Sequence, residues 1–250
     1  MTTSTASYDG SNGAAPVAAT GSHGTALTYD GSVLPVLSNA LPYRGTTALR
    51  WTASTTGIGA QNVGSGVSNN GFFRQYVRII GTPQGRFEIA RRPFSSNPTA
   101  GDWYASQLIT VGTDRKLSVH MATLGWDVDA SHADGDTYPG TRVTGATAIP
   151  NDQWVRVEGT IRRDLVAVKL WLNPASTGTP DVDISVADSL PAAVAYEAYW
   201  IGAGRIVGGV WSAFAPTGGV VEVDEFAFDT AGYPGPIVDA GTSYAGIVRL

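Results

Sequence analysis

An acidic run near the end of the chain, Glu222-Val223-Asp224-Glu225, is the first candidate for chemistry. In an extended strand the side chains of Glu222 and Asp224 lie on one face, about 7 Å apart. Two carboxyl groups at such a separation can hydrolyse a glycosidic bond, with one acting as acid and the other as base or nucleophile. A buried carboxylate can also be purely structural, accepting hydrogen bonds from backbone N–H groups. The spacing alone is compatible with both roles.

A second candidate is a base for polysaccharide cleavage by elimination. Tyr76 lies between Arg74 and Arg78 at strand spacing, so the three side chains share one face. A Tyr or His base beside an Arg that neutralises a uronate carboxylate suits a polysaccharide lyase. His120 lies in a strand-like segment, 116–120, and is the other candidate base. A lone His in a strand is more often a hydrogen-bonded structural residue, so lyase chemistry stays the alternative.

The segment 126–136 concentrates acidic side chains. It contains four aspartates: Asp127, Asp129, Asp134 and Asp136. Calcium binds clustered oxygen ligands, but Ser131 and Ala133 interrupt the spacing of an EF-hand loop. We expect a solvated hairpin with an Asp-Gly turn and no cofactor, with calcium as the alternative.

Aromatic side chains are the fourth candidate site. Exposed Trp and Tyr stack on the faces of sugars, because they combine apolar area with a polar tip. The chain has seven tryptophans, so most of them must belong to the core. The predicted carbohydrate-binding residues are Trp103, Tyr104, Trp126, Trp211, Arg74, Tyr76 and Arg78.

Two alternating segments, 154–161 and 165–172, supply the clearest structural element. In the first, Val155, Val157 and Ile161 fall on one face, and the opposite face carries Arg156, Glu158, Thr160 and Arg162. This period of two predicts strands with one buried and one wet face. Arg163-Asp164 is a plausible tight turn, which makes the pair an antiparallel hairpin with Trp171 on its outer face.

The rest of the chain indicates an all-β fold. Further strands are predicted at 45–51, 72–80, 85–91, 103–111, 116–124, 142–148, 184–188, 195–203 and 220–229, with 85–91 pairing with 72–80. No segment shows a helical period with caps. We predict one sandwich domain over 1–235, beginning with a Gly-, Ser- and Thr-rich arm, and a C-terminal arm over 236–250.

Composition excludes several classes of function. A net charge of −5 argues against nucleic acid, which requires a dense basic surface. Without cysteine there is no disulfide, thiol nucleophile or Cys-ligated zinc. The sequence shows no secretory signal and no apolar run of roughly 20 residues, so we expect synthesis in the cytoplasm and no membrane insertion.

Several segments together resemble a known superfamily. They are Tyr8–Gly13, Tyr43–Arg50, Phe72–Ile80, Asn151–Gly159, Ile201–Gly204 and Val223–Asp229. In this order they resemble the concanavalin A-like lectin/glucanase superfamily, in the laminin-G-like form found in bacteriophage virion proteins. The resemblance implies a two-sheet antiparallel jelly roll that binds partners on its concave sheet or rim loops.

The resemblance also bears on the candidate catalytic residues. Laminarinase-like members carry Glu-x-Asp-x-Glu or Glu-x-Asp-x-x-Glu in a central strand, whereas here Phe226 and Ala227 occupy the final position. The Gln-x-His and Tyr-x-Lys signatures of alginate lyase-like members are absent. In non-enzymatic laminin-G-like modules an Asp of the closing strand usually accepts backbone hydrogen bonds. We therefore expect Asp224 to be structural and the protein not to be an enzyme.

The expected function is that of a tail- or capsid-associated phage virion protein. Its lectin-like domain would adhere to host surface glycan or to neighbouring virion subunits, as a homo-oligomer or as part of a larger assembly. The expected location is the virion. Two alternatives are a polysaccharide-degrading enzyme on the same fold and a decoration protein without a ligand.

Overall fold

The computed structural model describes residues 3–6, 8, 10–14, 28–30, 35–52, 60–62, 71–81, 87–95, 104–122, 140–162, 164–187, 195–196, 200–201, 205–207, 210–212 and 220–237. Within these ranges all regular structure is β-strand. This part of the chain contains no helix with the length and apolar character to cross a membrane.

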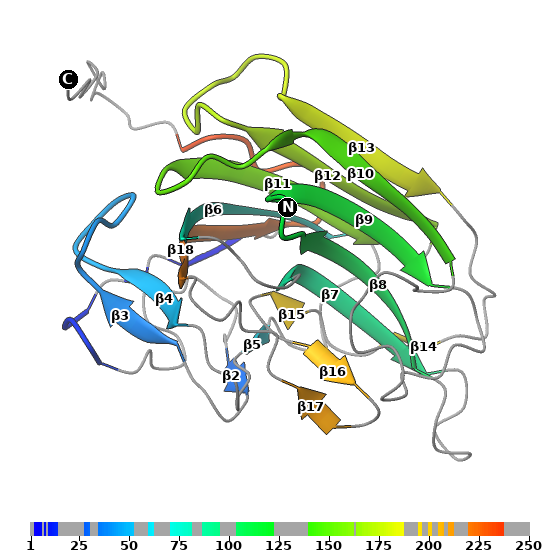
Figure 1. The fold of residues 1–250 in the computed structure, drawn as a ribbon, viewed down its shortest axis with the longest axis horizontal. Coiled ribbons are helices and arrows are strands. Elements are labelled where there is room, and N and C mark those ends of the chain that lie inside the picture. Colours follow the sequence, from blue (N-terminus) through cyan, green and yellow to red (C-terminus); the bar gives the residue numbers. More distant parts are fainter. Residues whose placement is uncertain are drawn as a thin grey trace.

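The described residues form two large antiparallel sheets and one small two-stranded sheet (Figure 1). Sheet A has the order β13 (Val182–Ala187), β12 (Leu165–Trp171), β11 (Trp154–Arg162), β6 (Phe72–Ile80), β18 (Val220–Asp229), β4 (Ala48–Thr52) and β3 (Val36–Ser38), and β1 (Thr3–Ala6) pairs with β18. Sheet B has the order β10 (Gly140–Ala148), β9 (Lys116–Ala122), β8 (Tyr104–Val111), β7 (Phe87–Ser95), β15 (Trp200–Ile201), β5 (Ala60–Asn62) and β2 (Thr28–Asp30). In addition, β14 (Ala195–Tyr196) pairs with β7, and β16 (Arg205–Val207) with β17 (Val210–Ser212) forms a separate hairpin.

The predicted fold class, an all-β jelly-roll sandwich, is confirmed. The predicted hairpin is β11–β12, where Arg162 pairs with Leu165. Strand 72–80 is β6 over the same residues, and the closing strand 220–229 is β18. The division into a domain over 1–235 and an arm over 236–250 stays a prediction.

One predicted pairing is wrong. Strand β6 does not pair with the next strand along the chain, β7, but with β11 and β18 in sheet A. Strand β7 pairs with β8 in sheet B. The connection after β6 therefore crosses from one sheet to the other, and strand alternation carries no signal that distinguishes a crossover from a hairpin.

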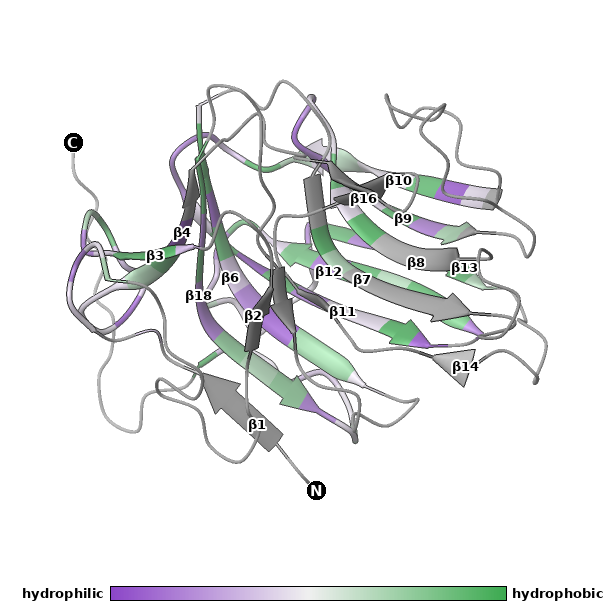
Figure 2. Ribbon diagram, turned by 90° about the horizontal axis from the view of Figure 1, so that it is seen from below, coloured by the Kyte–Doolittle hydropathy of each residue, from purple (hydrophilic) through white to green (hydrophobic). Residues whose placement is uncertain are grey.

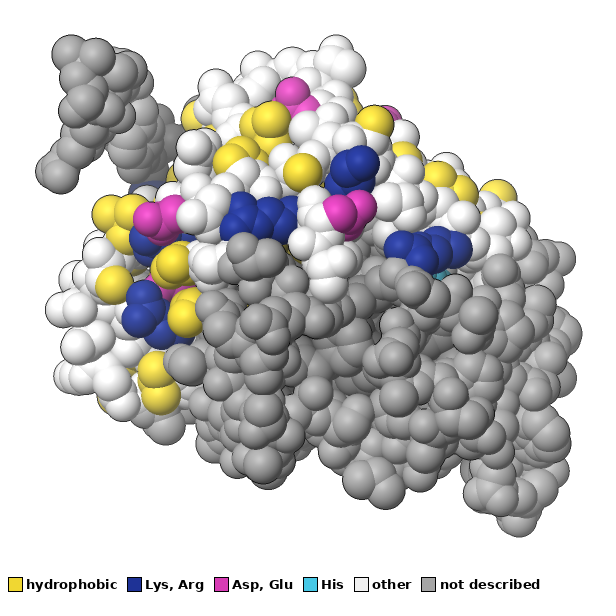
Figure 3. All heavy atoms as spheres, in the orientation of Figure 1, with side chains coloured by type: hydrophobic (Ala, Val, Ile, Leu, Met, Phe, Trp, Pro, Cys, Tyr) yellow, Lys and Arg dark blue, Asp and Glu magenta, His cyan; other side chains and the backbone are white. Residues whose placement is uncertain are grey.

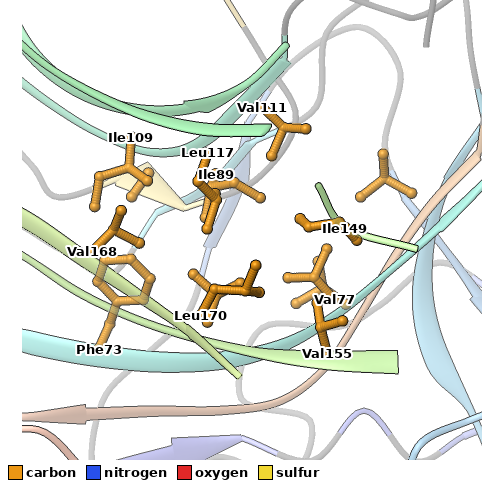
Figure 4. Packing of buried hydrophobic residues seen from close by; sticks show 14 of the residues in the cluster. Phe73, Val77, Ile89, Ile109, Val111, Leu117, Ile149, Val155, Val168 and Leu170 are labelled. Atoms are coloured by element: carbon orange, nitrogen blue, oxygen red, sulfur yellow. The ribbon is translucent and has the colours of Figure 1, made fainter. Parts of the chain in front are cut away.

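The core fills the space between the two sheets (Figure 4). From sheet A, Phe73, Val168 and Leu170 point inward, and Ile109 and Leu117 face them from sheet B. The alternation of hydrophobic and hydrophilic residues along β6, β11 and β12 matches this arrangement (Figure 2). These strands therefore present a mostly apolar face to the core and their charged side chains outward, and the buried Gln75 of β6 donates to Ile89 O of the other sheet.

A β-bulge in β18 interrupts this alternation. The register with β6 shifts between Asp224 and Ala227, and Glu225 has a φ of 47°. Val223 before the bulge and Phe226 after it both face the core, although they are three residues apart. The bulge therefore keeps both halves of the strand apolar toward the core while Asp224 points outward.

Candidate functional site

The outer face of sheet A is lined with charged side chains that are buried. The expectation that this face is wet is wrong, since Arg156 and Glu158 are each 1% exposed. Contacts to this face come from three segments: 41–46, between β3 and β4; 173–178, after β12; and 233–237, after β18. The sequence pattern predicted which residues point outward but not that these segments contact them.

Glu222 lies at the centre of a charged network with Arg50, Arg78 and Asp152. Its Oε1 is 2.7 Å from Arg50 Nη2, and its Oε2 accepts a 2.7 Å hydrogen bond from Arg78 Nη1. Arg78 Nε also donates to Asp152 Oδ1 at 2.8 Å. Glu222 is 1% exposed, so its charge is balanced by these two arginines rather than by water. This engagement favours a structural role for Glu222.

Asp224 is fully buried and accepts backbone hydrogen bonds, as a structural carboxylate would. Its Oδ2 accepts from the Arg44 N–H at 3.0 Å, and its Oδ1 accepts from the Glu225 N–H at 2.8 Å. The first bond attaches the 41–46 segment to the closing strand. Burial is the main cause that raises the pKa of Asp224 to about 7, and these backbone donors oppose the rise.

Asp224 should make stability depend on pH. The unfolded Asp titrates near pH 4, whereas the folded one keeps its proton up to about pH 7. Between these values only the folded state binds the proton, so stability falls as pH rises, by up to about 1.4 kcal/mol per pH unit. Denaturant unfolding of wild type and Asp224→Asn at pH 4.5 to 8 checks this. The wild-type curve should fall relative to the variant, and parallel curves would contradict the assignment.

A second buried group, the central cluster, consists of Arg74, Arg156 and Glu158. Arg156 lies with its guanidinium 4.0 Å from the centre of the Trp171 ring and donates from Nη1 to the carbonyls of Pro174 and Ser176, both at 2.7 Å. Its Nε is 2.8 Å from Glu158 Oε1, although the two atoms are not aligned for a hydrogen bond. Burial lowers the pKa of both arginines and raises that of Glu158.

Residues 233–237, called the strap below, lie over the central cluster. Arg74 Nη1 donates to Gly235 O at 2.9 Å, and the Gly235 N–H donates to Glu158 Oε2 at 3.3 Å. The Ile237 N–H donates to the Tyr76 hydroxyl at 2.9 Å. The chain after β18 therefore returns across the outer face of sheet A.

An aromatic group stands beside the charged network. The Tyr43 ring stacks on Tyr76, with centroids 3.9 Å apart, and meets Trp154 edge-on at 6.1 Å. The indole N–H of Trp154 donates to Leu41 O at 2.9 Å. Tyr76 is buried, Tyr43 and Trp154 are half-buried, and Leu41 is 51% exposed. We call Leu41, Tyr43 and Trp154 the aromatic rim.

The predicted carbohydrate-binding residues are placed only in part. The side chains of Trp103, Tyr104, Trp126 and Trp211 lie outside the described residues. Arg74, Tyr76 and Arg78 do share the outer face of β6, but all are buried, and other parts of the chain contact them. Their contact with a glycan stays a prediction.

The predicted lyase residues do not converge. His120 lies between Val119 and Met121, which face the core, so it points to the outer face of sheet B. Its Nε2 is 3.0 Å from Thr110 Oγ1. Tyr76 points outward from the other sheet, so the two candidate bases are on opposite sides of the sandwich.

The aspartates proposed for calcium cannot be placed. Asp127, Asp129, Asp134 and Asp136 lie outside the described residues. Elsewhere in the described ranges no group of three or more His, Cys, Asp or Glu side chains has the arrangement of a metal site. A calcium site at these aspartates stays an untested alternative.

Sequence reasoning missed the aromatic rim. Tyr43 and Trp154 are 111 positions apart in the printed sequence, and neither lies in a local pattern that predicts exposure. The one available signal was the outward position of Trp154 in its strand, which shares a face with Arg156 and Glu158. Figure 3 shows hydrophobic, basic and acidic side chains close together on the surface around β4.

No protein-family model matches this chain, and no curated protein matches it. Trypanosoma rangeli sialidase in complex with sialic acid is similar in fold, with 13% identity and a TM-score of 0.49 over 91% of this chain and 30% of the sialidase chain. Domain 4 of AbnA, a GH43 extracellular arabinanase from Geobacillus stearothermophilus in complex with arabinotriose, has 12% identity and a TM-score of 0.46 over 85% and 84% of the two chains. The PL-14 alginate lyase from Aplysia kurodai has 11% identity and a TM-score of 0.46 over 78% and 87%. The chain thus spans under a third of the sialidase, and these likenesses are of fold alone.

Proposed function

We propose that this chain is a carbohydrate-binding domain whose aromatic rim stacks on a sugar. The observation that carries the proposal is a half-buried Tyr43–Trp154 pair that is already fixed in place. Tyr43 is stacked on buried Tyr76, and the Trp154 indole is hydrogen-bonded to Leu41 O at 2.9 Å. Aromatic surfaces held in this way bind with little further loss of conformational entropy.

Polar groups beside the rim are suited to sugar hydroxyls. The Asp152 side chain is 52% exposed, and that of Arg50 is 28% exposed. Both are fixed through the charged network, because Arg50 binds Glu222 and Asp152 binds Arg78. An apolar surface with a few fixed polar groups is the usual composition of a small-ligand site.

The proposal is for binding without cleavage. Glu222 is engaged by two arginines, and Asp224 by two backbone N–H groups, so these two carboxylates support the structural role. A polysaccharide-cleaving enzyme on the same fold stays the alternative, with release of product as its signature.

The setting we propose is a bacteriophage virion, where the domain adheres to host surface glycan or to other virion subunits. The virion setting is supported by the sequence resemblance to laminin-G-like virion proteins. The aromatic rim supports glycan binding whether or not the domain is carried on a virion.

Replacing Trp154 with Ala should weaken glycan binding about 30-fold or more, as expected when a central aromatic contact of about 2 kcal/mol is removed. Trp154→Phe should keep affinity within a few-fold, because it retains a stacking face. Titration calorimetry with a glycan bound by the wild type measures both, and circular dichroism confirms the fold. Asp164→Ala, on the turn at the other end of β11, is the matched control. Unchanged affinity in folded Trp154→Ala would remove the rim as the site.

A further inference from the structure

The strap is held mainly through its backbone by side chains of sheet A. Arg74 and Glu158 contact the carbonyl and the N–H of Gly235, at 2.9 Å and 3.3 Å. The Tyr76 hydroxyl accepts from the Ile237 N–H at 2.9 Å. Three polar side chains on neighbouring strands β6 and β11 thus bind the backbone of one short segment, and these three side chains are called the groove below.

The strap sequence, Tyr233-Pro234-Gly235-Pro236-Ile237, suits such a groove. Two prolines fix their own φ angles, which reduces the conformational entropy that the segment loses when it binds. Gly235 has a φ of +72°, a conformation that other residues adopt only with strain. Tyr233 supplies a side-chain anchor, with its ring edge-on to Phe72 at 4.9 Å and Lys169 Nζ 4.9 Å from its centroid.

The groove is organised by contacts that do not involve the strap. Glu158 is paired with Arg156, which the 173–178 segment holds through the Pro174 and Ser176 carbonyls. Arg74 also donates to Glu225 O at 3.3 Å, and the Tyr76 ring is stacked on Tyr43. Arg74, Tyr76 and Glu158 therefore keep contacts with other parts of the chain when the strap is absent.

The link between the strap and β18 is short and open. Thr230 and Ala231 are exposed, and a Cβ at Gly232 would meet no atom within 4 Å. Within the link the Ala231 N–H donates to Asp229 Oδ1 at 2.7 Å, a hydrogen bond between neighbouring residues rather than to another segment. Exchange of a terminal segment across a hinge of this kind is a low-cost route to association between identical chains.

We propose that the groove formed by Arg74, Tyr76 and Glu158 is a recognition site for a Tyr-Pro-Gly-Pro-Ile segment, and that the strap of a second copy of this chain can occupy it in place of the chain's own. The contacts are identical in the two cases, since they involve only the groove and residues 233–237. The site lies beyond the glycan-binding role, and its occupant is a peptide rather than a sugar.

A fluorescent peptide with the sequence of residues 231–239, titrated into the full-length chain by anisotropy, tests the groove. In the wild type the chain's own strap competes at an effective concentration near millimolar, so binding should be weak. Tyr233→Ala in the protein removes the strap's anchor and should tighten peptide binding at least 10-fold. Adding Tyr76→Phe to that variant removes one hydrogen bond and should weaken binding about 3- to 10-fold.

A peptide carrying Gly235→Ala is the matched control, and it should bind about 10-fold more weakly because Ala is strained at this φ. Equal binding of the two peptides, or no saturable binding to Tyr233→Ala, would overturn the proposal. Light scattering should show wild-type dimer increasing with protein concentration. A constant monomer mass at every concentration would exclude exchange with a second copy.

Discussion

Glu222→Gln is expected to lower the free energy of unfolding by about 3–5 kcal/mol, the usual cost of breaking a buried ion pair from one side. The carboxylate is 1% exposed and is within 2.7 Å of nitrogens of both Arg50 and Arg78. Gln has nearly the same shape but no charge, so two arginines would lose their counter-ion. Arg78 is itself buried and would retain only Asp152 as an acidic partner among the contacts given above.

Denaturant unfolding of Glu222→Gln and Asp164→Asn, compared with the wild type, measures this effect. Asp164 pairs with Arg162 at 2.9 Å, but the side chains are 58% and 32% exposed, so this pair should contribute less than about 1 kcal/mol. A loss for Glu222→Gln as small as that of Asp164→Asn would show that the charged network does not stabilise the outer face.

Gly159→Val is expected to cost about 3 kcal/mol or more, because it forces atoms into a close contact between the sheets. A Cβ at Gly159 would lie 2.6 Å from Phe73 Cε1 and 2.8 Å from Ile109 Cδ1, which belong to sheets A and B respectively. Gly159→Ala should cost about 1–3 kcal/mol by the same mechanism.

Gly232→Ala is the matched control, since its Cβ would meet nothing within 4 Å. Its melting temperature and unfolding free energy should stay close to those of the wild type. If Gly159→Ala and Gly159→Val were as stable as Gly232→Ala, Phe73 and Ile109 would not be packed across the core as described.

The strands of this fold could be predicted because their alternation is local. Strands β6, β11 and β12 carry a period of two, interrupted on the inner face of β6 by Gln75, and each appears within one residue of its predicted bounds. Sheet membership could not be predicted in the same way. Pairing of β6 with β11 and β18, rather than with β7, depends on contacts between segments far apart in the chain.

The candidate site was harder to predict for a related reason. Alternation placed Arg156 and Glu158 outward correctly, but their burial results from segments 173–178 and 233–237 lying against that face. The bulge at Glu225 did leave a trace in the sequence: the apolar residues Val223 and Phe226 are separated by three positions instead of two. The contact between the Tyr43 and Trp154 rings left no such trace in the sequence.

Glycan binding is the central claim, and the most direct measurement is a glycan-array and host-envelope binding assay on the wild-type chain. Mass spectrometry of the same wells detects released products. The structure of the aromatic rim predicts saturable binding to at least one glycan class, loss of that binding in Trp154→Ala, and no cleaved product. Release of product would instead establish a polysaccharide-degrading enzyme, and failure to bind any glycan would contradict the role proposed for the rim.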